Sequence, residues 1–363
     1  MTRLPRSAAA VLALALLLLV STAQAVTIDW VTVGNEGNLA DTTTYGAVGS
    51  KYQIDKYEVT NTQYAEFLNA KATTNGDTLA LYNTSMSSDA RGGITRTGSG
   101  TLVTPYVYTV KSGQGNNPVV FVSFYDSLRF ANWMHNLQGV GDTETGAYTL
   151  LGGTATPSNG LTVTRNGGAT VFLTSEDEWY KAAYHDKTAG TAATYFDYPT
   201  STDTVPYSDN PSSLNTPDFS NTANFFKDDS TANGYDGGFA KTDSPSFVSA
   251  TNYLTDVGAY TLADSPYGTF DQGGNVFEWD EAFISGSSRG VRGGSWNNGT
   301  TSLAASFRIG VSPTLENDSV GFRVASPFSE TAAVPEPSSV VLAGIGGMVL
   351  MLWYRRRSQK STL

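Results

Sequence analysis

The sequence has no cysteine and only two histidines among 363 residues. Without cysteine the chain can form no disulfide, no thiolate metal site and no cysteine nucleophile. Two histidines are too few for a three-histidine iron site, and no convincing catalytic triad can be assembled around His135 or His185. Both are expected at helix ends, where a histidine interacts favourably with backbone carbonyls without any catalytic role. Enzymes that depend on a thiol of their own are therefore excluded.

Charged residues are also scarce, at 15% of the chain, and the formal net charge is −11. Residues 26–332 hold 32 acidic and 16 basic side chains. Such an acidic surface repels nucleic acid and suits cations and solubility, so we expect no DNA or RNA partner. Abundant Gly, Ser, Thr and Asn favour a loop-rich globular domain over a helical bundle, and an aromatic content of 12% argues against disorder.

Long apolar runs occur only at the two ends of the chain. Arg3 and Arg6 precede an apolar run over 8–20, and Ala23-Gln24-Ala25 supplies a small-residue cleavage site. This order is typical of a secretory signal peptide, predicted here over 1–25, with a mature chain that starts at Val26.

The other end carries Val334-Pro335-Glu336-Pro337, an apolar run over about 338–354, and then Arg355–Arg357. The run is near the lower limit for a transmembrane helix, and the arginines fit the positive-inside rule. Residues 333–363 resemble a PEP-CTERM sorting tail, which implies a membrane helix, exosortase-type processing and a place in the cell envelope or, after cleavage, the extracellular matrix. A plain single-pass anchor is the alternative.

Between these ends the patterns predict short strands and three capped helices. The predicted strands are 27–33, 52–57, 119–122 and 171–173. The helices are expected to begin at Thr60 or Asn61, at Ser123 with Asp126 as a capping box, and within 174–178. Residues 71–116 and 186–265 are polar and weakly periodic, and the first of them shows a hairpin pattern around 102–110.

The stretch Tyr267–Trp296 combines paired glycines with large aromatics, so its backbone must turn tightly and approach neighbouring chain closely. It also carries four side-chain oxygen donors of the kind that hard cations prefer, on Asp271, Asn275, Glu278 and Asp280. By composition alone a polar loop with buried aromatic anchors remains an alternative to a cation site. The GxSxG pattern at 286–290 leads into a predicted strand, whereas a nucleophile elbow leads into a helix.

Six stretches of the chain, taken in order, resemble the formylglycine-generating, sulfatase-modifying factor family. They are YEVTNTQYAEFLN (57–69), NPVVFVSFYDSLRFANWM (117–134), LTSEDEWYKAAY (173–184), GNVFEW (274–279), RGGSW (292–296) and GFRVA (321–325). The resemblance implies one α+β domain over 26–328, loop-rich and C-type-lectin-like, with structural calcium.

The resemblance also implies two sets of calcium ligands. The first set comprises the side chains of Asn224 and Asp236 with the backbone carbonyls of Phe225 and Gly238, at a spacing shifted by a residue or two. The second comprises the side chains of Asp271 and Glu278 with the backbone carbonyls of Gly274 and Val276.

Catalytic members of the family carry two cysteines just after the RGGS motif, where they bind copper. These positions fall on Asn298 and Leu303, which have no sulfur, so formylglycine-generating oxidase activity and a copper cofactor are not expected. The loop from Trp296 to Arg308, with Asn298 and Leu303, is expected to line a groove.

The sequence therefore favours a non-catalytic, calcium-stabilised binding module at the envelope, with a glycan or protein ligand. One alternative is an enzyme that modifies a peptide or protein by a different, metal-dependent chemistry. Another is a structural matrix protein whose insertions at 71–116 and 186–222 form the contact surfaces.

Overall fold

The computed structural model describes residues 25–74, 78–139 and 141–329. The chain up to Pro327 belongs to one compact unit, and the following account concerns its described residues. The signal peptide predicted over 1–25, apart from Ala25, and the tail predicted over 333–363 lie outside them. Within the described ranges, no helix has the length and apolar character needed to cross a membrane.

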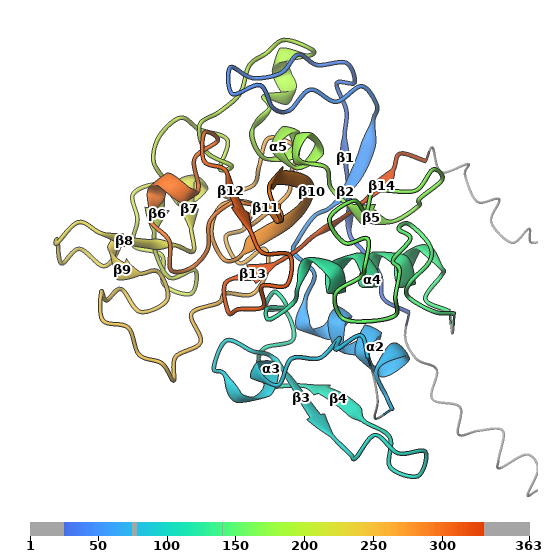
Figure 1. The fold of residues 1–363 in the computed structure, drawn as a ribbon. Helices are drawn as coiled ribbons and strands as arrows, with labels where there is room; N and C mark the ends of the chain where they lie inside the picture. Colours follow the sequence, from blue (N-terminus) through green and yellow to red (C-terminus); the bar gives the residue numbers. More distant parts are fainter. Residues whose placement is uncertain (1–24, 75–77, 140, 330–363) are drawn as a thin grey trace, which may run out of the picture. The chain divides into compact units, whose positions relative to one another are not determined.

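Two four-stranded sheets organise the domain (Figure 1). The first has the order β1-β2-β14-β5 and is antiparallel throughout; its strands are Trp30–Val33, Tyr52–Asp55, Val324–Pro327 and Phe172–Leu173 in that order. The second has the order β12-β11-β10-β13, and its strands are Ile309–Val311, Ser288–Arg292, Phe277–Ser285 and Val320–Gly321. The pair β10–β13 is parallel and the other pairs are antiparallel.

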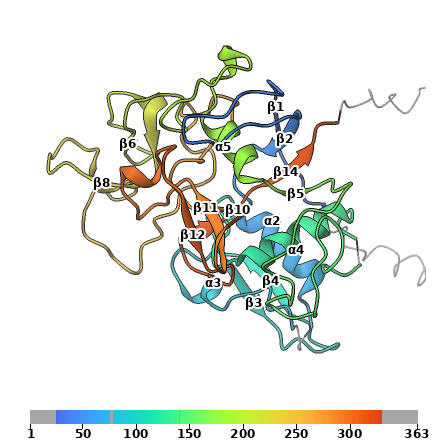
Figure 2. The ribbon, with the colours of Figure 1, turned by 45° about the horizontal axis from the view of Figure 1, so that its top comes forward.

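Three small two-stranded sheets lie in the polar insertions. Strands β3 (Ile94–Thr97) and β4 (Val107–Val110) form the hairpin expected in the first insertion, next to the short helix α3 (Ser85–Ser88). The second insertion holds the parallel pair β6–β7 and the antiparallel pair β8–β9, which comprise Tyr207–Ser208, Thr222–Ala223, Phe226–Asp228 and Gly237–Phe239. Figures 1 and 2 both place β6 and β8 on one side of β10 and β11, with α2 and α4 on the other.

Each of the three main helices begins at a capping box; the sequence predicts the box at Ser123 and a cap at Thr60 or Asn61 and within 174–178. Helix α2 (Asn61–Lys71) is capped by Thr60, α4 (Phe124–His135) by Ser123, and α5 (Glu176–Tyr184) by Ser175. In every case the cap side chain accepts the backbone N–H three residues on, and that residue's side chain accepts the cap N–H, which is worth about 1 kcal/mol per cap. Single-turn 3-10 helices occur at Lys187–Ala189, Phe219–Asn221 and Thr300–Ser302.

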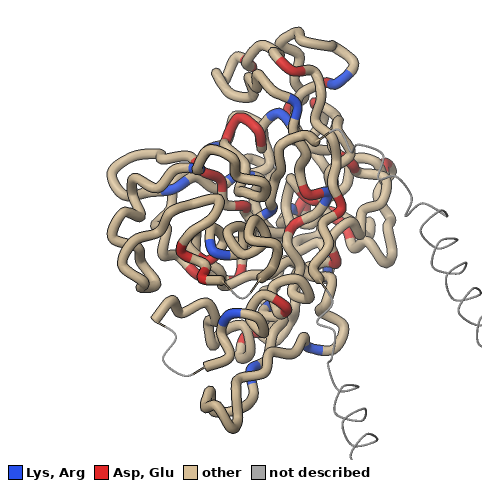
Figure 3. Tube along the Cα trace, turned by 90° about the vertical axis from the view of Figure 1, so that its right-hand side faces the viewer, with Lys and Arg blue, Asp and Glu red and all other residues tan. Residues whose placement is uncertain are grey.

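The main core is aromatic where α2 meets α4. Phe67 lies 5.4 Å from Trp133 and 5.6 Å from Phe130, ring centroid to centroid, and Phe130 in turn lies 5.4 Å from Phe322 before β14. Edge-to-face pairs of this kind add about 0.5–1.5 kcal/mol each beyond burial. Charged residues are thinly spread along the described trace (Figure 3). We therefore expect apolar packing and backbone hydrogen bonds to supply most of the stability of the fold.

The predicted strand over 119–122 is wrong. These residues are buried but belong to no sheet, because Phe121 adopts a φ of +61°, which breaks an extended run. The backbone hydrogen bonds go to two separate segments: the Val119 N–H donates to the carbonyl of Val59 and the Phe121 N–H to that of Asn317, and Thr60 and Pro118 form an isolated bridge. The apolar pattern correctly predicted that these residues are buried and wrongly predicted that they form a strand.

Candidate functional site

The stretch Tyr267–Trp296 turns by positive backbone angles at two glycine-rich corners. At the first, Gly274 has a φ of +91°, and a Cβ there would lie 2.3 Å from the backbone oxygen of Asn224. At the second, Gly293 has a φ of +96°, and a Cβ would lie 2.6 Å from the backbone oxygen of Gln272. Only glycine fits such close approaches at such angles. Both corners are thereby held against neighbouring chain, and β10 and β11 run between them.

A fully buried ion pair lies at the centre of this region. Arg323 donates two hydrogen bonds to Glu278, from Nε to Oε2 at 2.5 Å and from Nη2 to Oε1 at 2.7 Å, and neither side chain is exposed. The indole N–H of Trp179 donates to Glu278 Oε2 at 2.7 Å. Arg323 also donates to the backbone carbonyls of Asp55 and Phe270. The pair thus joins α5, β2, β10 and the residue before β14.

Three more carboxyl groups lie near this single arginine: Asp55 and Glu58 are buried and Asp271 is half-buried. Burial raises the pKa of Asp55 to about 8 and that of Asp271 to about 6, and it raises the pKa of Glu58 well above its usual value. Glu58 Oε2 accepts the amide of Asn275 at 3.2 Å, whereas Glu58 Oε1 and Asp55 Oδ2 have no hydrogen-bond partner. Carboxyl oxygens outnumber the cations that could balance them.

The second predicted calcium set does not fit a metal in this arrangement. Both oxygens of Glu278 are taken by Arg323 and Trp179, and Asp271 Oδ2 accepts the N–H of Gly258 at 2.6 Å. Gly274 and Val276 lie in the same segment and contribute backbone carbonyls only. A guanidinium already balances the charge that calcium would balance.

The first predicted set does come together, around Ser208 of β6. The Ser208 hydroxyl donates to the carbonyl of Phe225 at 2.6 Å and lies 3.3 Å from the carbonyl of Gly238. Asp236 accepts the Ser208 N–H with Oδ1 at 2.7 Å and pairs with Lys227 through Oδ2 at 2.8 Å. Two carbonyls and one carboxylate therefore converge, which is a donor set suited to calcium.

Asn224, the fourth residue of that set, directs its side-chain amide elsewhere. Its Nδ2 donates to the backbone carbonyl of Tyr253 at 2.9 Å and to Asn275 Oδ1 at 3.0 Å. Across the residues that the structure describes, no group of three or more His, Cys, Asp or Glu side chains is placed to hold a metal ion. Any calcium at the first set would depend on backbone carbonyls.

The four residues predicted to line one groove lie in different surroundings. Leu303 is fully buried against Ala223 and Phe225. Arg308 pairs with Glu176, Nε to Oε1 at 2.8 Å, a carboxylate that it shares with Arg292. The side-chain oxygen of Asn298 accepts the hydroxyl of Ser295 at 2.5 Å. Of the four, Trp296 lines a pocket.

That pocket has a volume of about 460 Å³ and an aromatic wall. It is lined by Phe226, Phe239, Pro245, Phe247, Trp296, Asn297 and Asp318. Behind this lining, Tyr253 stacks on Trp296 with an interplanar angle of 4° and ring centroids 4.9 Å apart. Phe247 stacks on Trp296 at 6.1 Å and 20° and is 53% exposed. The Phe247 ring is therefore partly exposed to solvent while it packs against Trp296 and Tyr253.

The edge of the aromatic pocket is polar. The Trp296 indole N–H donates to the Asp318 carbonyl, and the Asp318 carboxylate accepts Arg91 Nε, both at 3.0 Å. The Arg91 guanidinium carbon lies 5.5 Å from the centroids of both Phe247 and Trp296. Arg91 is itself buried and its guanidinium is engaged by Asp318, Asp89 and backbone carbonyls. The stacked rings beside the Asp318 carboxylate and the exposed Asn297 can bind a ligand that has an apolar face and polar edges.

Sequence reasoning missed most of this pocket. Phe226, Phe239 and Phe247 lie in the insertion over 186–265, which has no period to reveal what its aromatics face. A usable signal was the density of aromatics in a segment otherwise rich in Asn, Asp and Ser, since loops of that composition rarely need so many rings.

Comparisons with known proteins place the sequence in a family. Residues 31–327 match the family model described as the sulfatase-modifying factor enzyme 1-like domain, and residues 333–357 match the PEP-CTERM protein-sorting motif. The sorting motif indicates export, targeting to the cell surface and processing by exosortase-type machinery. A search of the curated proteins finds no match.

Several solved structures resemble the fold at low sequence identity. Treponema denticola variable protein 1 is 19% identical with a TM-score of 0.48, over 85% of this chain and 98% of that one. The crystal structure of CarF gives the same identity and score, over 84% of this chain and 99% of that one. PvdO from Pseudomonas aeruginosa is 15% identical with a TM-score of 0.40, over 84% and 93% of the two chains.

Proposed function

The chain belongs to the sulfatase-modifying factor enzyme 1-like domain family, and on that premise we propose that it is a non-catalytic binding module displayed at the cell surface. The aromatic pocket at Trp296 is its ligand site. The observation that carries this proposal is the cluster of three mutually stacked rings, Tyr253, Trp296 and Phe247, in which Phe247 is 53% exposed and lies in the same pocket lining as Asp318 and Asn297.

The ligand class that this pocket suits best is an envelope or exopolysaccharide glycan. A sugar ring offers a face of C–H groups that packs on an aromatic ring, while its hydroxyls both donate and accept hydrogen bonds. Asp318 supplies an acceptor and Asn297 both a donor and an acceptor, while the buried Arg91 holds the Asp318 carboxylate in place. A pocket of about 460 Å³ lies within the usual range for small-molecule sites.

The absence of sulfur at the family's catalytic positions supports a binding role over oxidation. Asn298 and Leu303 replace the two cysteines, and Leu303 is fully buried among apolar side chains. Monovalent copper prefers sulfur ligands, which these two residues do not provide. The alternative, an enzyme that modifies a peptide or protein by another metal-dependent chemistry, has weaker support because the Trp296 pocket has Asp318 as its single carboxylate and no histidine among its lining residues.

Calcium is proposed as a structural partner of the first ligand set only. Asp236 with the carbonyls of Phe225 and Gly238 would hold it, and calcium would compete there with Lys227 for the Asp236 carboxylate. A metal that binds the folded state alone adds stability that grows with the logarithm of its concentration once this exceeds the Kd. The midpoint of thermal unfolding should therefore rise with calcium and fall back when a chelator is added.

The processing of the chain is proposed as the sequence indicated. A signal peptide over 1–25 is removed on export, the domain spans 26–328 with a C-type-lectin-like architecture, and the apolar part of the 333–363 tail inserts in the membrane before or without cleavage.

A ligand pull-down tests the binding role. The full chain, kept in mild detergent for its apolar tail, is incubated with envelope and exopolysaccharide extract from the producing cells, and retained glycans are identified. We expect Phe247→Ala to lower affinity about tenfold, a loss of about 1.4 kcal/mol of aromatic contact. Phe219→Ala is the matched control, because Phe219 is similarly exposed, at 45%, and lies outside the pocket.

Two results would overturn the proposal. One is glycan retention that Phe247→Ala leaves unchanged. The other is metal-dependent oxygen consumption with a peptide or thiol substrate, which would support the enzyme alternative.

A further inference from the structure

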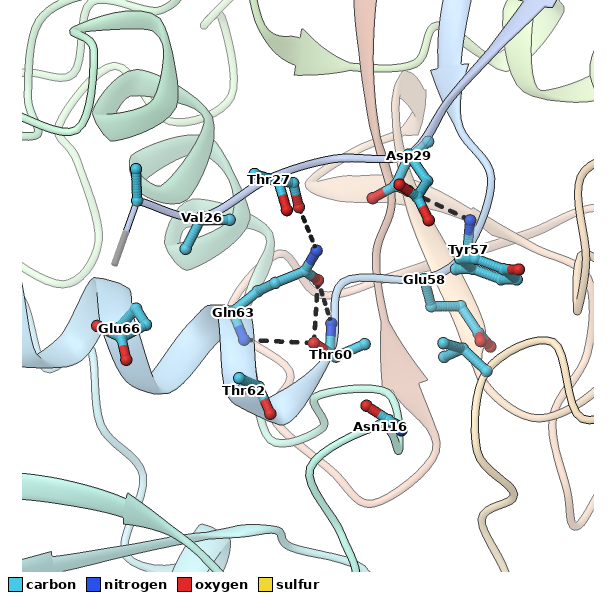
Figure 4. Close-up of a pocket in the computed structure, with 13 residues that line it drawn as sticks. Val26, Thr27, Asp29, Tyr57, Glu58, Thr60, Thr62, Gln63, Glu66 and Asn116 are labelled. Carbon is cyan, nitrogen blue, oxygen red and sulfur yellow. Dashed lines mark hydrogen bonds between the residues drawn. The ribbon is translucent and has the colours of Figure 1, made fainter. Parts of the chain in front are cut away.

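A second pocket, far from Trp296 in sequence, is strongly acidic. Its volume is about 460 Å³, and it lies between the start of the described chain, the end of β2 and the first turn of α2 (Figure 4). Among the described residues that line it, four are acidic and none is Lys, Arg or His; the acidic residues are Asp29, Asp55, Glu58 and Glu66. In Figure 4, Asp29, Tyr57 and Glu58 lie on one side and Thr60 and Gln63 on the other.

Two of these carboxylates are buried and incompletely paired. Asp55 is 2% exposed and Glu58 is not exposed, and Asp55 Oδ2 and Glu58 Oε1 each lack a hydrogen-bond partner. A buried polar atom left without a partner costs about 1–3 kcal/mol, more when it carries charge. Two such oxygens in the lining of one pocket indicate that a donor is missing from it.

The neighbouring cations are engaged elsewhere. Arg323 gives its paired hydrogen bonds to Glu278 and reaches Asp55 only at the backbone carbonyl. Lys56 lies outside the lining, with its Nζ 5.3 Å from the ring centroids of Tyr57 and Phe270. Among the described residues, the lining therefore holds no lysine or arginine to balance its acidic side chains. Burial raises the pKa of Asp55 and of Glu58, so a cation that binds there would favour the ionised form of both carboxyl groups.

The shape of the pocket favours an organic cation over a metal ion. Calcium and magnesium need several oxygens within about 2.0–2.6 Å of one point. No three Asp, Glu, His or Cys side chains of the described residues are placed that way. An ammonium carries three N–H donors and a guanidinium five, and these can reach acceptors that are spread over a larger space. The ring of Tyr57 and the methylenes of Gln63 offer apolar contact for an alkyl stem.

We propose that this acidic pocket binds an alkylammonium or guanidinium group. The cation enters at the exposed Asp29, with the half-buried Glu66 also in the lining, and is held over the floor formed by Asp55 and Glu58. Such a group can come from a free amine or from a lysine or arginine side chain of a peptide. The proposal is independent of the Trp296 pocket, with which this lining shares no residue.

Calorimetric titration of the full chain in mild detergent tests the proposal. The probes are 1,5-diaminopentane, Nα-acetyl-lysine methylamide and the neutral isostere Nα-acetyl-norleucine methylamide. We expect both amines to bind, the isostere to bind at least tenfold more weakly, and added salt to weaken the amines. If diaminopentane binds as tightly as the lysine derivative, the source is a free amine; if the lysine derivative binds tenfold tighter, the source is a peptide.

Variants show whether the pocket holds the cation. Asp29→Asn, Asp55→Asn and Glu58→Gln should each weaken amine binding about five- to tenfold. Asp29 is exposed, so its variant keeps the test decisive even if the two buried changes impair folding. Asp264→Asn removes the same charge from an exposed residue outside the pocket and should leave binding unchanged.

Equal affinity for the amine and its isostere would overturn the proposal, as would wild-type affinity in Asp29→Asn together with Asp55→Asn. Binding of calcium chloride alone, with no amine binding, would also overturn it. None of these outcomes bears on glycan retention through Phe247.

Discussion

The two oxygen-rich regions of the domain, one around Ser208 and one around Glu278, differ in the groups that donate hydrogen bonds to their oxygens. Around Ser208 a hydroxyl and Lys227 hold them, and that lysine side chain is 24% exposed. Around Glu278 a fully buried guanidinium and an indole hold them. Water can replace a partly exposed lysine at little cost, whereas a buried arginine cannot leave without stranding its partner. We therefore expect that Lys227 can be displaced from Asp236 in the first region, whereas Arg323 stays paired with Glu278 in the second.

Removal of Arg323 should have the largest effect on the second region. We expect Arg323→Met to destabilise the protein by about 3–5 kcal/mol, because Glu278 is left buried and unpaired beside three other carboxyl groups. Denaturant unfolding measures the change. The double variant Arg323→Met with Glu278→Gln should recover part of the loss, and failure to do so would assign the defect to lost packing instead of charge.

Acidification should stabilise the second region and not the first. Burial raises the pKa of Asp55 to about 8, so its protonated form is favoured by folding. The stability contributed is fully present below the unfolded value near 4 and is lost as pH rises through about 8, at up to about 1.4 kcal/mol per pH unit. Unfolding free energies between pH 5 and 8 should thus increase towards acid.

Asp126 provides a control for that pH dependence. Burial raises its pKa to about 7, and it lies in the capping box of α4, away from both regions. Asp126→Asn keeps an acceptor for Ser123 and should flatten the pH profile below about 7, while Asp55→Asn should flatten it up to about 8. A profile that rises towards alkaline pH would contradict the expected direction.

Arg308 should matter less than Arg323 although it also pairs with a glutamate. Arg308 is 30% exposed, and Glu176 keeps Arg292 at 2.6 Å when Arg308 is lost. We expect Arg308→Met to cost about 1 kcal/mol, measured by the same denaturant unfolding. A loss of stability as large as that of Arg323→Met would mean that burial of an ion pair does not determine how much the pair contributes to the free energy of unfolding.

Lys227→Met should have the smallest effect on stability and a specific effect on calcium. Because the Asp236–Lys227 pair is partly exposed, we expect a loss below about 1 kcal/mol in the absence of calcium. Removal of the competing charge should raise calcium affinity about tenfold, measured by calorimetry. Unchanged affinity, or calcium binding that Asp236→Asn does not weaken, would contradict the assignment to the first set.

The sequence predicted those parts of the fold that depend on local chemistry. The family and the sorting tail were recognised from short motifs, and the comparisons confirm both. The cap at Ser123 was found because a hydroxyl followed three residues later by an acceptor is a local pattern, and the cap at Thr60 or Asn61 because both residue types favour a helix start. The strand at 119–122 was wrong because the positive φ of Phe121 is imposed by distant packing.

The candidate sites could be predicted only in part, because they join segments that are far apart in the sequence. Asp236 and Phe225 were named as ligands, but the Ser208 hydroxyl between them comes from a two-residue strand that has no periodic signal. Glu58 stands in a recognised motif and Asp55 lies just before it. The sequence does not show that their oxygens lack partners, because it does not show that Arg323 pairs with Glu278.

The pairing of β2 with β14 has a consequence for how the protein folds. Arg323 Nη1 reaches the Asp55 carbonyl across 268 positions of sequence, and β14 lies between β2 and β5 in the first sheet. Contacts between residues so distant in sequence form late and make folding slow. The first sheet therefore cannot close while the chain is still being synthesised or threaded through a membrane; it closes when almost the whole domain has emerged, and until then the edges of β2 and β5 are exposed to other chains.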